Sequence, residues 1–418
     1  MFLRRRSSLS LGADGPLLQV KVALFTEVFL PKIDGVVTRL RNTVAELQRQ
    51  GDQVLIFAPG EGITNYEGAD IVRMPGNRFP LYPELTLSFP RASMRRRLLN
   101  FEPDVIHAAD PACLAAGAVY YADVLNKPLI VSYHTRLPKY LHYYGLGALE
   151  PAAWALMRLR HNKAQMNLCT SSVMVEELTS HGVERVRLWP KAVDTEGFHP
   201  RFASPSMRQW LSQGHPDGPL LLYVGRVSPE KGIEKLRPVL EAIPNARLAI
   251  VGGGPHQKHL EQLFLGTRTF FAGYLSGQRL AEAMASVDAL VLPSQSETLG
   301  LVLIEAMAAG TIVIGARAGG IPDIIIDGQT GFLFDPATDT ALTDVVRHLL
   351  ANPAEAQAMR RLAREQAEQW SWTAATQRLK EFYREAIDTP RKPKNVSKPF
   401  FEQAIKKTAI SGIKLFLP

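Results

Sequence analysis

The sequence predicts an α/β fold of two domains, each with a parallel sheet covered by helices on both faces. Short apolar segments typical of buried strands alternate with helical stretches along most of the chain. This alternation begins near residue 20, is interrupted near residue 195 and begins again near residue 219. The length of 418 residues fits two or three domains. We therefore expect two parallel sheets that face each other across a cleft.

The first predicted domain covers 20–195. A helix over 36–50 is expected because Asp34-Gly35 supplies a turn before it and Gly51 ends it. Runs of mostly apolar residues, bounded by turn-forming residues, indicate the strands of this domain. These runs are 20–26, 53–58, 104–108 and 128–133.

The second predicted domain covers 196–372 and follows a junction at 191–201 that is rich in turn-forming residues. A helix over about 373–389 is expected to pack back on the first domain. Residues 1–19 are expected to be a leader, and 390–418 a basic amphipathic tail. The predicted strands of the second domain are 219–225, 246–251, 269–272, 289–292 and 312–316.

The formal net charge of +8 is concentrated at the C-terminal end of the chain. Residues 391–418 contain seven Lys and Arg residues against one acidic residue, Glu402. A segment of this kind favours a polyanionic partner, either nucleic acid or an anionic membrane surface. Because Phe400, Phe401 and Ile405 lie among these cations, as in an interfacial helix, we expect an anionic membrane surface and no nucleic acid.

No segment is expected to span a membrane or to act as a secretion signal. The nearest candidate span, 299–316, contains Glu305 and three glycines, and no apolar segment of adequate length follows the basic residues 1–6. Cys113 and Cys169 lack metal-ligand spacing and are expected to be reduced core residues.

Ligands of open parallel sheets bind at the carboxyl ends of the strands, and one such end carries two acidic residues. Glu297 follows the strand 289–292 in a turn, and Glu305 lies in the next predicted helix. Glu297 is suited to sugar hydroxyls and Glu305 to a ribose diol, because a carboxylate accepts two hydroxyl donors. The alternative is a capped core helix with two incidental acids. The backbone amides of Thr298, Leu299 and Gly300 would lie at the N-terminus of this helix, where they are suited to bind an anion.

Other strand-end loops carry cations, glycines and a histidine. Arg226 and Lys231 could bind a diphosphate and stabilise it as it departs, although an ordinary solvated loop is the alternative. Gly252 and Gly253 would let the backbone approach a ligand, but glycine runs also occur in dinucleotide folds. His134 could contact a sugar hydroxyl or a developing positive charge, although a single histidine is more often structural.

Taken together, these residues resemble the retaining glycosyltransferases of glycosyltransferase family 4. Members of that family have the GT-B fold, in which two Rossmann-like domains face each other across a cleft. The resemblance covers roughly 20–390 and includes the junction Val193-Asp194 with Phe198-His-Pro. Two departures from many relatives are Asp34-Gly35 in place of Gly-Gly, and Lys191-Ala-Val-Asp194 at the junction.

The resemblance implies a UDP-sugar donor and a role for each matching residue. His134, Arg226, Lys231 and Glu297 would act at the reacting centre, with the two cations on the diphosphate and His134 near the reacting carbon. Tyr274 would lie beside the uracil. No metal or other cofactor is expected, because Arg226 and Lys231 supply the charge of a divalent ion. The implied donor-binding residues are Gly35, Gly252, Gly253, Tyr274, Glu297, Thr298, Leu299, Gly300 and Glu305.

More narrowly, five motifs resemble those of the sulfoquinovosyltransferases of photosynthetic organisms. This resemblance implies transfer of sulfoquinovose from UDP-sulfoquinovose to diacylglycerol by a peripheral enzyme at the cytoplasmic side of a plasma or thylakoid membrane. Arg136 first, and Lys139 second, are candidates for binding the sulfonate, because they follow His134 on the same loop. The motifs are 132–135, 188–194, 198–202, 293–301 and 316–323. The cations expected to face the membrane are Arg91, Arg95, Arg96 and Arg97.

Three other functions remain open on the sequence. Another lipid glycosyltransferase of the same family would transfer glucose to diacylglycerol or mannose to an inositol lipid. A nicotinamide-dependent oxidoreductase would use Gly252-Gly-Gly but would leave Glu297 and Glu305 without a role. A non-catalytic membrane-binding protein would not need the cations and carboxylates of the strand-end loops.

Overall fold

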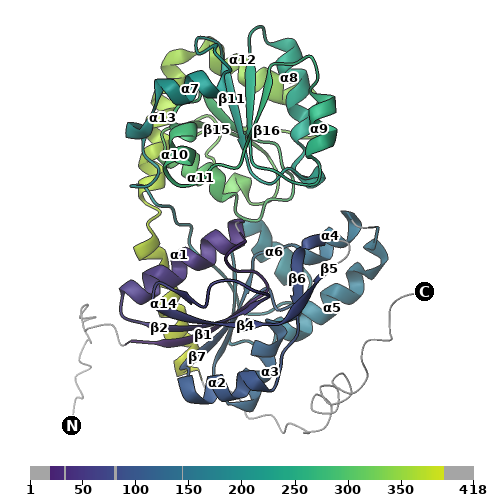
Figure 1. Ribbon diagram of the computed structural model, residues 1–418, viewed down its shortest axis with the longest axis vertical. Coiled ribbons are helices and arrows are strands. Elements are labelled where there is room, and N and C mark those ends of the chain that lie inside the picture. Colours follow the sequence, from purple (N-terminus) through teal and green to yellow (C-terminus); the bar gives the residue numbers. More distant parts are fainter. Residues whose placement is uncertain (1–18, 33, 80–81, 144, 390–418) are drawn as a thin grey trace, which may run out of the picture.

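The chain folds into two α/β domains, as the sequence predicts (Figure 1). The computed structural model describes residues 19–389 except 33, 80–81 and 144. The predicted leader up to residue 18 and the predicted tail 390–418 lie outside the described residues. In Figure 1 the second domain stands above the first, and the C-terminal helix α14 crosses back to the first domain.

The first domain is built on an eight-stranded sheet in the order β10-β9-β8-β7-β1-β2-β4-β3. All neighbouring strands are parallel except β3, which runs antiparallel to β4. The mostly apolar sequences of the central strands follow from burial on both faces. The strands are β1 (Lys21–Thr26), β2 (Gln53–Pro59), β3 (Asn65–Tyr66), β4 (Ala69–Met74), β7 (Val105–Ala109), β8 (Leu129–Tyr133), β9 (Met166–Cys169) and β10 (Val186–Leu188).

Helices cover both faces of this sheet. Asp34 begins α1, because its carboxylate accepts a hydrogen bond from the amide of Val37 at 2.8 Å. A separate antiparallel hairpin consists of β5 (Gly76–Phe79) and β6 (Tyr82–Ser88). The helices are α1 (Gly35–Arg49), α2 (Ser93–Phe101), α3 (Ala116–Val124), α4 (Leu137–Tyr143), α5 (Glu150–His161) and α6 (Ser172–Ser180), with a 3-10 turn η1 (Gly147–Leu149).

The second domain has a six-stranded parallel sheet in the order β13-β12-β11-β14-β15-β16, and its core is a single large cluster of buried apolar residues. The strands are β11 (Leu220–Val224), β12 (Arg247–Val251), β13 (Thr269–Gly273), β14 (Ala289–Leu292), β15 (Ile312–Ala316) and β16 (Phe332–Phe334). The helices are α7 (Pro205–Leu211), α8 (Arg237–Ala242), α9 (Gln257–Leu263), α10 (Gly277–Ala285), α11 (Leu301–Ala308), α12 (Ala341–Ala351) and α13 (Pro353–Glu368). The 3-10 turns are η2 (Pro200–Phe202), η3 (Pro229–Lys231), η4 (Ile233–Leu236) and η5 (Ile321–Asp323).

The last described helix, α14 (Trp372–Asp388), belongs to the first domain by its packing. Leu379, Phe382 and Tyr383 join the buried cluster beneath α1. Lys380 forms a fully buried ion pair with Asp52, with Nζ 2.7 Å from Oδ2. The chain therefore passes between the domains twice, and the amide of Val193 donates to the carbonyl of Trp370 at 2.8 Å where the passages meet.

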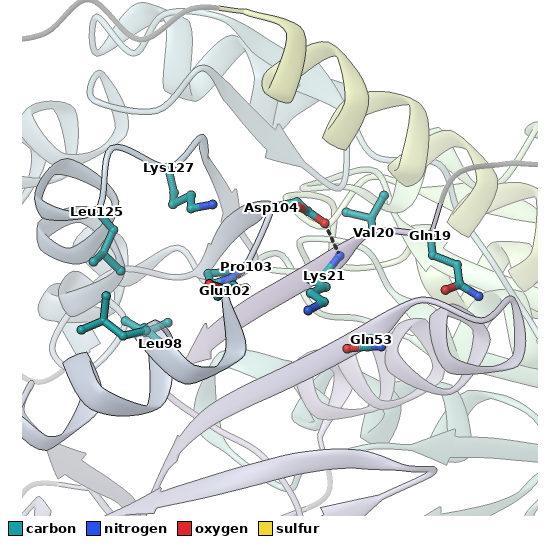
Figure 2. Close-up of a pocket in the computed structure, with 11 residues that line it drawn as sticks. Gln19, Val20, Lys21, Gln53, Leu98, Glu102, Pro103, Asp104, Leu125 and Lys127 are labelled. Carbon is teal, nitrogen blue, oxygen red and sulfur yellow. Dashed lines mark hydrogen bonds between the residues drawn. The ribbon is translucent and has the colours of Figure 1, made fainter.

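A hollow of about 600 Å³ lies at the amino ends of the first-domain strands, away from the carboxyl ends (Figure 2). Lys21, Asp104 and Lys127 line it, and the amide of Lys21 donates to Asp104 at 2.8 Å. Ligands of parallel sheets bind at the opposite, carboxyl edge, so the functional site is expected there. None of the described helices is long and apolar enough to cross a bilayer.

Candidate active site

The carboxyl ends of the second-domain strands bring together a predicted cation and a predicted carboxylate. Lys231 lies in the loop after β11, and its Nζ is 2.5 Å from Oε1 of Glu297 in the loop after β14. The two side chains are only 17% and 15% exposed, so the charges neutralise each other in a partly buried position. Arg226, on the same loop as Lys231, is 29% exposed, and its Nη1 lies 3.9 Å from Glu230. A diphosphate approaching this loop would compete with Glu297 for Lys231.

The glycine run after β12 packs tightly on the loop that carries Arg226. A Cβ at Gly252 would collide with the carbonyl oxygen of Gly225, and one at Gly254 with that of Val227. A Cβ at Gly253 would lie 2.8 Å from the ring of Tyr274, which is 79% exposed. The glycines therefore allow two ligand-facing loops and an exposed aromatic ring to lie side by side.

The segment between β14 and α11 offers backbone donors for an anion. Among the described residues, no hydrogen-bond acceptor is recorded for the amides of Thr298, Leu299 and Gly300, although Leu299 and Gly300 are buried. Gly300 has a φ of 68°, a left-handed conformation that favours glycine at the start of α11. Gly320 donates to the carbonyl of Glu297 at 2.8 Å and fixes the course of this segment.

Glu305 lies one turn into α11, and its protonation is set by its surroundings. Burial raises its pKa to about 7 from an ordinary value of 4.5, with Asp194 adding to the rise and Arg41 of α1 opposing it. Arg41 comes from the first domain, so the electrostatics of Glu305 depend on both walls of the cleft. A ribose diol that donates to this carboxylate would favour its ionised form.

On the first-domain wall, the start of α1 leaves space beside Gly35. A Cβ at Gly35 would meet no atom within 4 Å. Asp34 places a carboxylate at this helix terminus, where it accepts from Val37 and lies 3.2 Å from Nζ of Lys32. The terminus therefore already has an anionic partner, which weakens its attraction for a phosphate compared with a Gly-Gly sequence.

His134 follows β8 and is held from several sides. Its backbone amide donates to Oδ1 of Asp110 at 2.7 Å, and its ring packs edge-on against Trp189 with centroids 5.5 Å apart. The side chain is 4% exposed. Burial and the nearby Arg39 lower the pKa of His134 to about 3, so the imidazole is neutral at physiological pH. It can exchange hydrogen bonds with a sugar, but it carries no charge.

Hydrogen bonds connect His134 to three further buried side chains. Its Nε2 lies 2.8 Å from Oγ of Ser132, and Nε2 of His107 lies 2.9 Å from the same oxygen. Nδ1 of His107 lies 2.8 Å from the hydroxyl of Tyr383 on α14. The connection of Ser132, His107 and Tyr383 to His134 could not be predicted, since no short-range pattern connects a strand residue with a helix more than 200 positions later.

The two predicted sulfonate-binding cations share one buried carboxylate. Nε of Arg136 lies 2.8 Å from Oε2 of Glu177, and both side chains are at most 8% exposed. Nζ of Lys139 lies 3.6 Å from Oε1 of Glu177 and is half exposed. Arg136 is therefore buried against Glu177, and Lys139 is the more accessible of the two cations.

Direct contacts join the two walls of the cleft. The amide and hydroxyl of Ser172, at the start of α6, donate to the two carboxylate oxygens of Asp323 at 2.5 Å each. The hydroxyl of Thr170 donates to the carbonyl of Thr298 at 3.2 Å. Ser172 and Asp323 thus hold the strand-end loops of the second domain against the first, a contact that no sequence motif indicated.

The exposed arginines in and just before α2 lie apart from these loops. Arg91, Arg95, Arg96 and Arg97 are all exposed, whereas Met94 and Leu98 are buried against the domain. In Figure 1, α2 lies at the end of the first domain farthest from the second domain. The helix therefore presents positive charge to solvent.

One group of side chains in the described part of the chain has a metal-ligand composition: Glu234, His256 and His259. Nε2 of His256 already contacts Oε1 of Glu234 at 2.5 Å, and the two imidazole rings stack with centroids 4.5 Å apart. This contact ties the start of α9 to η4. The predicted donor-binding residues do not include any of the three.

Two family models match the chain, one in each domain. The model described as Glycosyltransferase Family 4 matches residues 33–197. The model described as Glycosyl transferases group 1 matches residues 212–366. The boundary between the two matches falls where the chain first passes between the domains.

Known proteins resemble the whole two-domain chain. A sulfoquinovosyl transferase of Arabidopsis thaliana is 38% identical over 400 residues, covering 91% of this chain and 78% of the relative. A GDP-mannose-dependent alpha-mannosyltransferase of Mycolicibacterium smegmatis is 36% identical over 340 residues, covering 79% and 89%. The solved structure of sucrose-phosphate synthase from Thermosynechococcus elongatus matches with a TM-score of 0.72 at 23% identity, covering 88% and 99%. At that identity, the structural match establishes a shared fold.

Proposed function

The chain belongs to glycosyltransferase family 4 and has the GT-B fold, and on this premise we propose that it transfers sulfoquinovose from UDP-sulfoquinovose to diacylglycerol. The product would be the anionic lipid sulfoquinovosyl diacylglycerol. The observation that carries the proposal is the identity of 38% to a sulfoquinovosyl transferase, sustained over 400 residues and therefore over both domains.

The donor would lie along the carboxyl ends of the second-domain strands. Tyr274 offers an exposed ring for uracil, and Glu305 offers a carboxylate for the ribose. The diphosphate would replace Glu297 as the ion-pair partner of Lys231, because a dianion attracts the ammonium more strongly than one carboxylate does. Glu297, once released, would accept hydrogen bonds from the sugar hydroxyls. Binding of the phosphates would thus prepare the sugar site.

The reaction would proceed with retention, through front-face attack assisted by stabilisation of the leaving group. UDP gains negative charge as the bond to the sugar breaks, and Lys231 and Arg226 would offset that charge. A covalent intermediate would need a carboxylate free to act as nucleophile, whereas in this proposal Glu297 binds the sugar hydroxyls and Glu305 binds the ribose. We infer no requirement for a metal ion, since Lys231 and Arg226 would face the leaving group.

The lipid acceptor would be reached from an anionic membrane surface by a peripherally bound enzyme. The exposed arginines of α2 would contribute electrostatic attraction. Leu156 and Leu159 of α5 are 45% and 62% exposed in the same domain, and could enter the boundary between headgroups and acyl chains.

A second candidate function is mannosyl transfer from GDP-mannose, favoured by the 36% identity to a mannosyltransferase. The two functions require different nucleotides and different sugars. Sulfoquinovose carries a sulfonate that mannose lacks, and the cluster of Arg136, Lys139 and Glu177 has a net charge of +1 available for it.

The test supplies each donor separately. Protein is incubated with diacylglycerol and either UDP-sulfoquinovose, UDP-glucose or GDP-mannose, and the lipid product is identified by mass. The proposal requires sulfoquinovosyl diacylglycerol, with the anomeric configuration of the donor retained in its NMR spectrum and with undiminished yield in the presence of a chelator. A mannosyl lipid as the only product would establish the second candidate instead.

A further inference from the structure

The hydrogen-bonded chain from α14 to the cleft is shielded from solvent along its whole length. Tyr383, His107, Ser132 and His134 are at most 4% exposed. Consecutive polar atoms are 2.8, 2.9 and 2.8 Å apart. Because water does not compete at these positions, the side chains themselves must satisfy one another as donors and acceptors.

Counting the protons on these side chains shows which group donates and which accepts in each hydrogen bond. Burial lowers the pKa of His107 and of His134 to about 3, so each neutral ring has one N–H and one acceptor nitrogen. Burial raises the pKa of Tyr383, so its hydroxyl keeps its proton. Among the described residues, the only partner recorded for that hydroxyl is Nδ1 of His107. A proton on Nδ1 would leave the buried hydroxyl proton without an acceptor, so Tyr383 must donate.

Each following hydrogen bond is then fixed. His107 has its acceptor on Nδ1 and its proton on Nε2, so it donates to Ser132. The hydroxyl of Ser132 accepts from His107 and donates to Nε2 of His134. His134 accepts at Nε2, so its single proton lies on Nδ1.

We propose that Tyr383 is a positioning residue for sugar transfer, which acts through His107 and Ser132 to hold the proton of His134 on Nδ1. The N–H at Nδ1 is then the group that His134 offers to a hydroxyl of the donor sugar. The catalytic consequence rests on the proposed function, in which His134 contacts the donor, but the position of the proton does not.

The return of the polypeptide to the first domain in α14 brings Tyr383 to this network. The ion pair between Lys380 and Asp52 fixes α14 one turn before Tyr383, and Asp52 also accepts from the amide of Val20 at 2.9 Å. Docking of the helix therefore both completes a buried cluster of the first domain and determines the tautomer of His134.

The experiment measures the tautomer directly. Protein labelled with ¹⁵N at histidine is studied by long-range ¹H–¹⁵N correlation, which distinguishes a protonated ring nitrogen from a bare one, and His134→Gln assigns the signals. In the wild type, we expect the proton of His134 on Nδ1. Tyr383→Phe keeps the ring but removes the donated proton, so a mixture of the two His134 tautomers is expected.

The matched control is Tyr121→Phe. The buried Tyr121 donates its hydroxyl proton to the carbonyl of Arg91 at 2.7 Å and takes no part in the hydrogen bonds that lead to His134. This control should leave the His134 signals unchanged. A wild-type proton on Nε2, or an unchanged tautomer in folded Tyr383→Phe, would overturn the inference; the wild-type spectrum decides it even if that variant does not fold.

The transferase activity of Tyr383→Phe distinguishes failure of this inference from failure of the proposed function. With the expected tautomer change, Tyr383→Phe should lower kcat/KM for the donor about tenfold, the usual effect of losing one oriented hydrogen bond. A tautomer change without loss of activity would support the positioning of the proton and contradict the assignment of His134 to the donor sugar.

Discussion

Lys231 and Arg226 are the residues whose loss should affect catalysis most. In the proposed reaction, replacing either by Ala would remove a cation that offsets charge on the departing UDP, and we expect a loss of about 2–4 kcal/mol of transition-state stabilisation, or roughly a hundredfold or more in kcat. Lys235→Ala is the matched control, because its Nζ donates to the carbonyl of Pro336 at 2.7 Å. Steady-state rates with saturating acceptor measure the effect, and near-normal kcat in both variants would refute the assignment.

Glu305 should make UDP binding depend on pH. If UDP binds the ionised carboxylate, a pKa of about 7 predicts affinity that rises roughly tenfold between pH 6 and pH 8. Glu305→Gln should bind UDP weakly and lack the tenfold rise in affinity. Because any pH dependence that remains in this variant comes from other groups, including the phosphates of UDP, the variant also serves as the control for their titration. Calorimetry at several pH values measures this, and parallel profiles for the two proteins would be inconsistent with the ribose assignment.

The carboxyl group of Glu305 should also make the stability of the folded protein depend on pH, with stability falling as pH rises. Its pKa in the folded protein lies above the ordinary 4.5, so the folded state holds the proton more tightly between pH 4.5 and 7. Its contribution to stability is therefore greatest at low pH and is lost as pH rises through about 7. Glu305→Gln is accordingly expected to melt at a higher temperature than the wild type at pH 8, and the two should converge near pH 5.

Lys139 gives the cleanest test of how a sulfonate is recognised. Its side chain is half exposed, so Lys139→Ala should leave folding unchanged and narrow the preference for UDP-sulfoquinovose over UDP-glucose about fivefold. Arg136→Ala instead leaves the buried Glu177 without its closest partner and should lose about 3–5 kcal/mol of stability. Ratios of kcat/KM and thermal melting separate the two effects. An unchanged ratio in Lys139→Ala would mean that the sulfonate is bound elsewhere.

The sequence located these charged residues but could not reveal how they pair. Lys231 and Glu297 follow different strands, and only the order of β11 and β14 in the sheet brings them together. Arg136 looked available because Glu177 lies on α6, a helix with no sequence feature to connect it to that loop. Partners of charged side chains depend on tertiary contacts, and these leave little trace in local patterns.

Among the elements, α2 carries the clearest prediction about the membrane. Replacing Arg95, Arg96 and Arg97 by Ala removes three exposed charges, each worth about 1 kcal/mol near anionic lipid at low salt. Binding to vesicles containing anionic lipid should weaken by roughly two orders of magnitude, and the difference should shrink as salt rises. Replacing Lys258, Arg268 and Arg361, exposed on the second domain, is the control of equal charge. Equal sedimentation of both triple variants with the vesicles would exclude α2 as the contact.

The strands expected from apolar runs and the first helix are observed, because their signals are local, whereas β4, β9, β10 and β16 were not predicted. The strand expected at 289–292 is β14 as observed, and the helix expected at 36–50 is α1 over Gly35–Arg49. Apolar runs and the Asp34-Gly35 turn suffice for these elements. The sequence could not reveal that α14 carries Tyr383 to within 2.8 Å of His107, because that contact depends on how the helix docks.

For the whole molecule, the sequence was sufficient to predict two parallel-sheet domains and the glycosyltransferase family, and the structure and relatives confirm both. The contacts across the cleft were not predictable. Ser172 with Asp323, and Thr170 with Thr298, join residues more than 120 positions apart and fix how the two walls meet. Such contacts depend on the orientation of the domains, which no local pattern encodes.

The central claim, that the enzyme uses UDP-sulfoquinovose, is tested most directly by competition between donors. UDP-sulfoquinovose and UDP-glucose at equal concentrations are offered with diacylglycerol in one reaction, and the ratio of the two lipid products is measured by mass. A site that holds a sulfonate through charged hydrogen bonds predicts an excess of sulfoquinovosyl diacylglycerol of roughly tenfold or more. Glucosyl diacylglycerol in equal or greater amount would contradict the account.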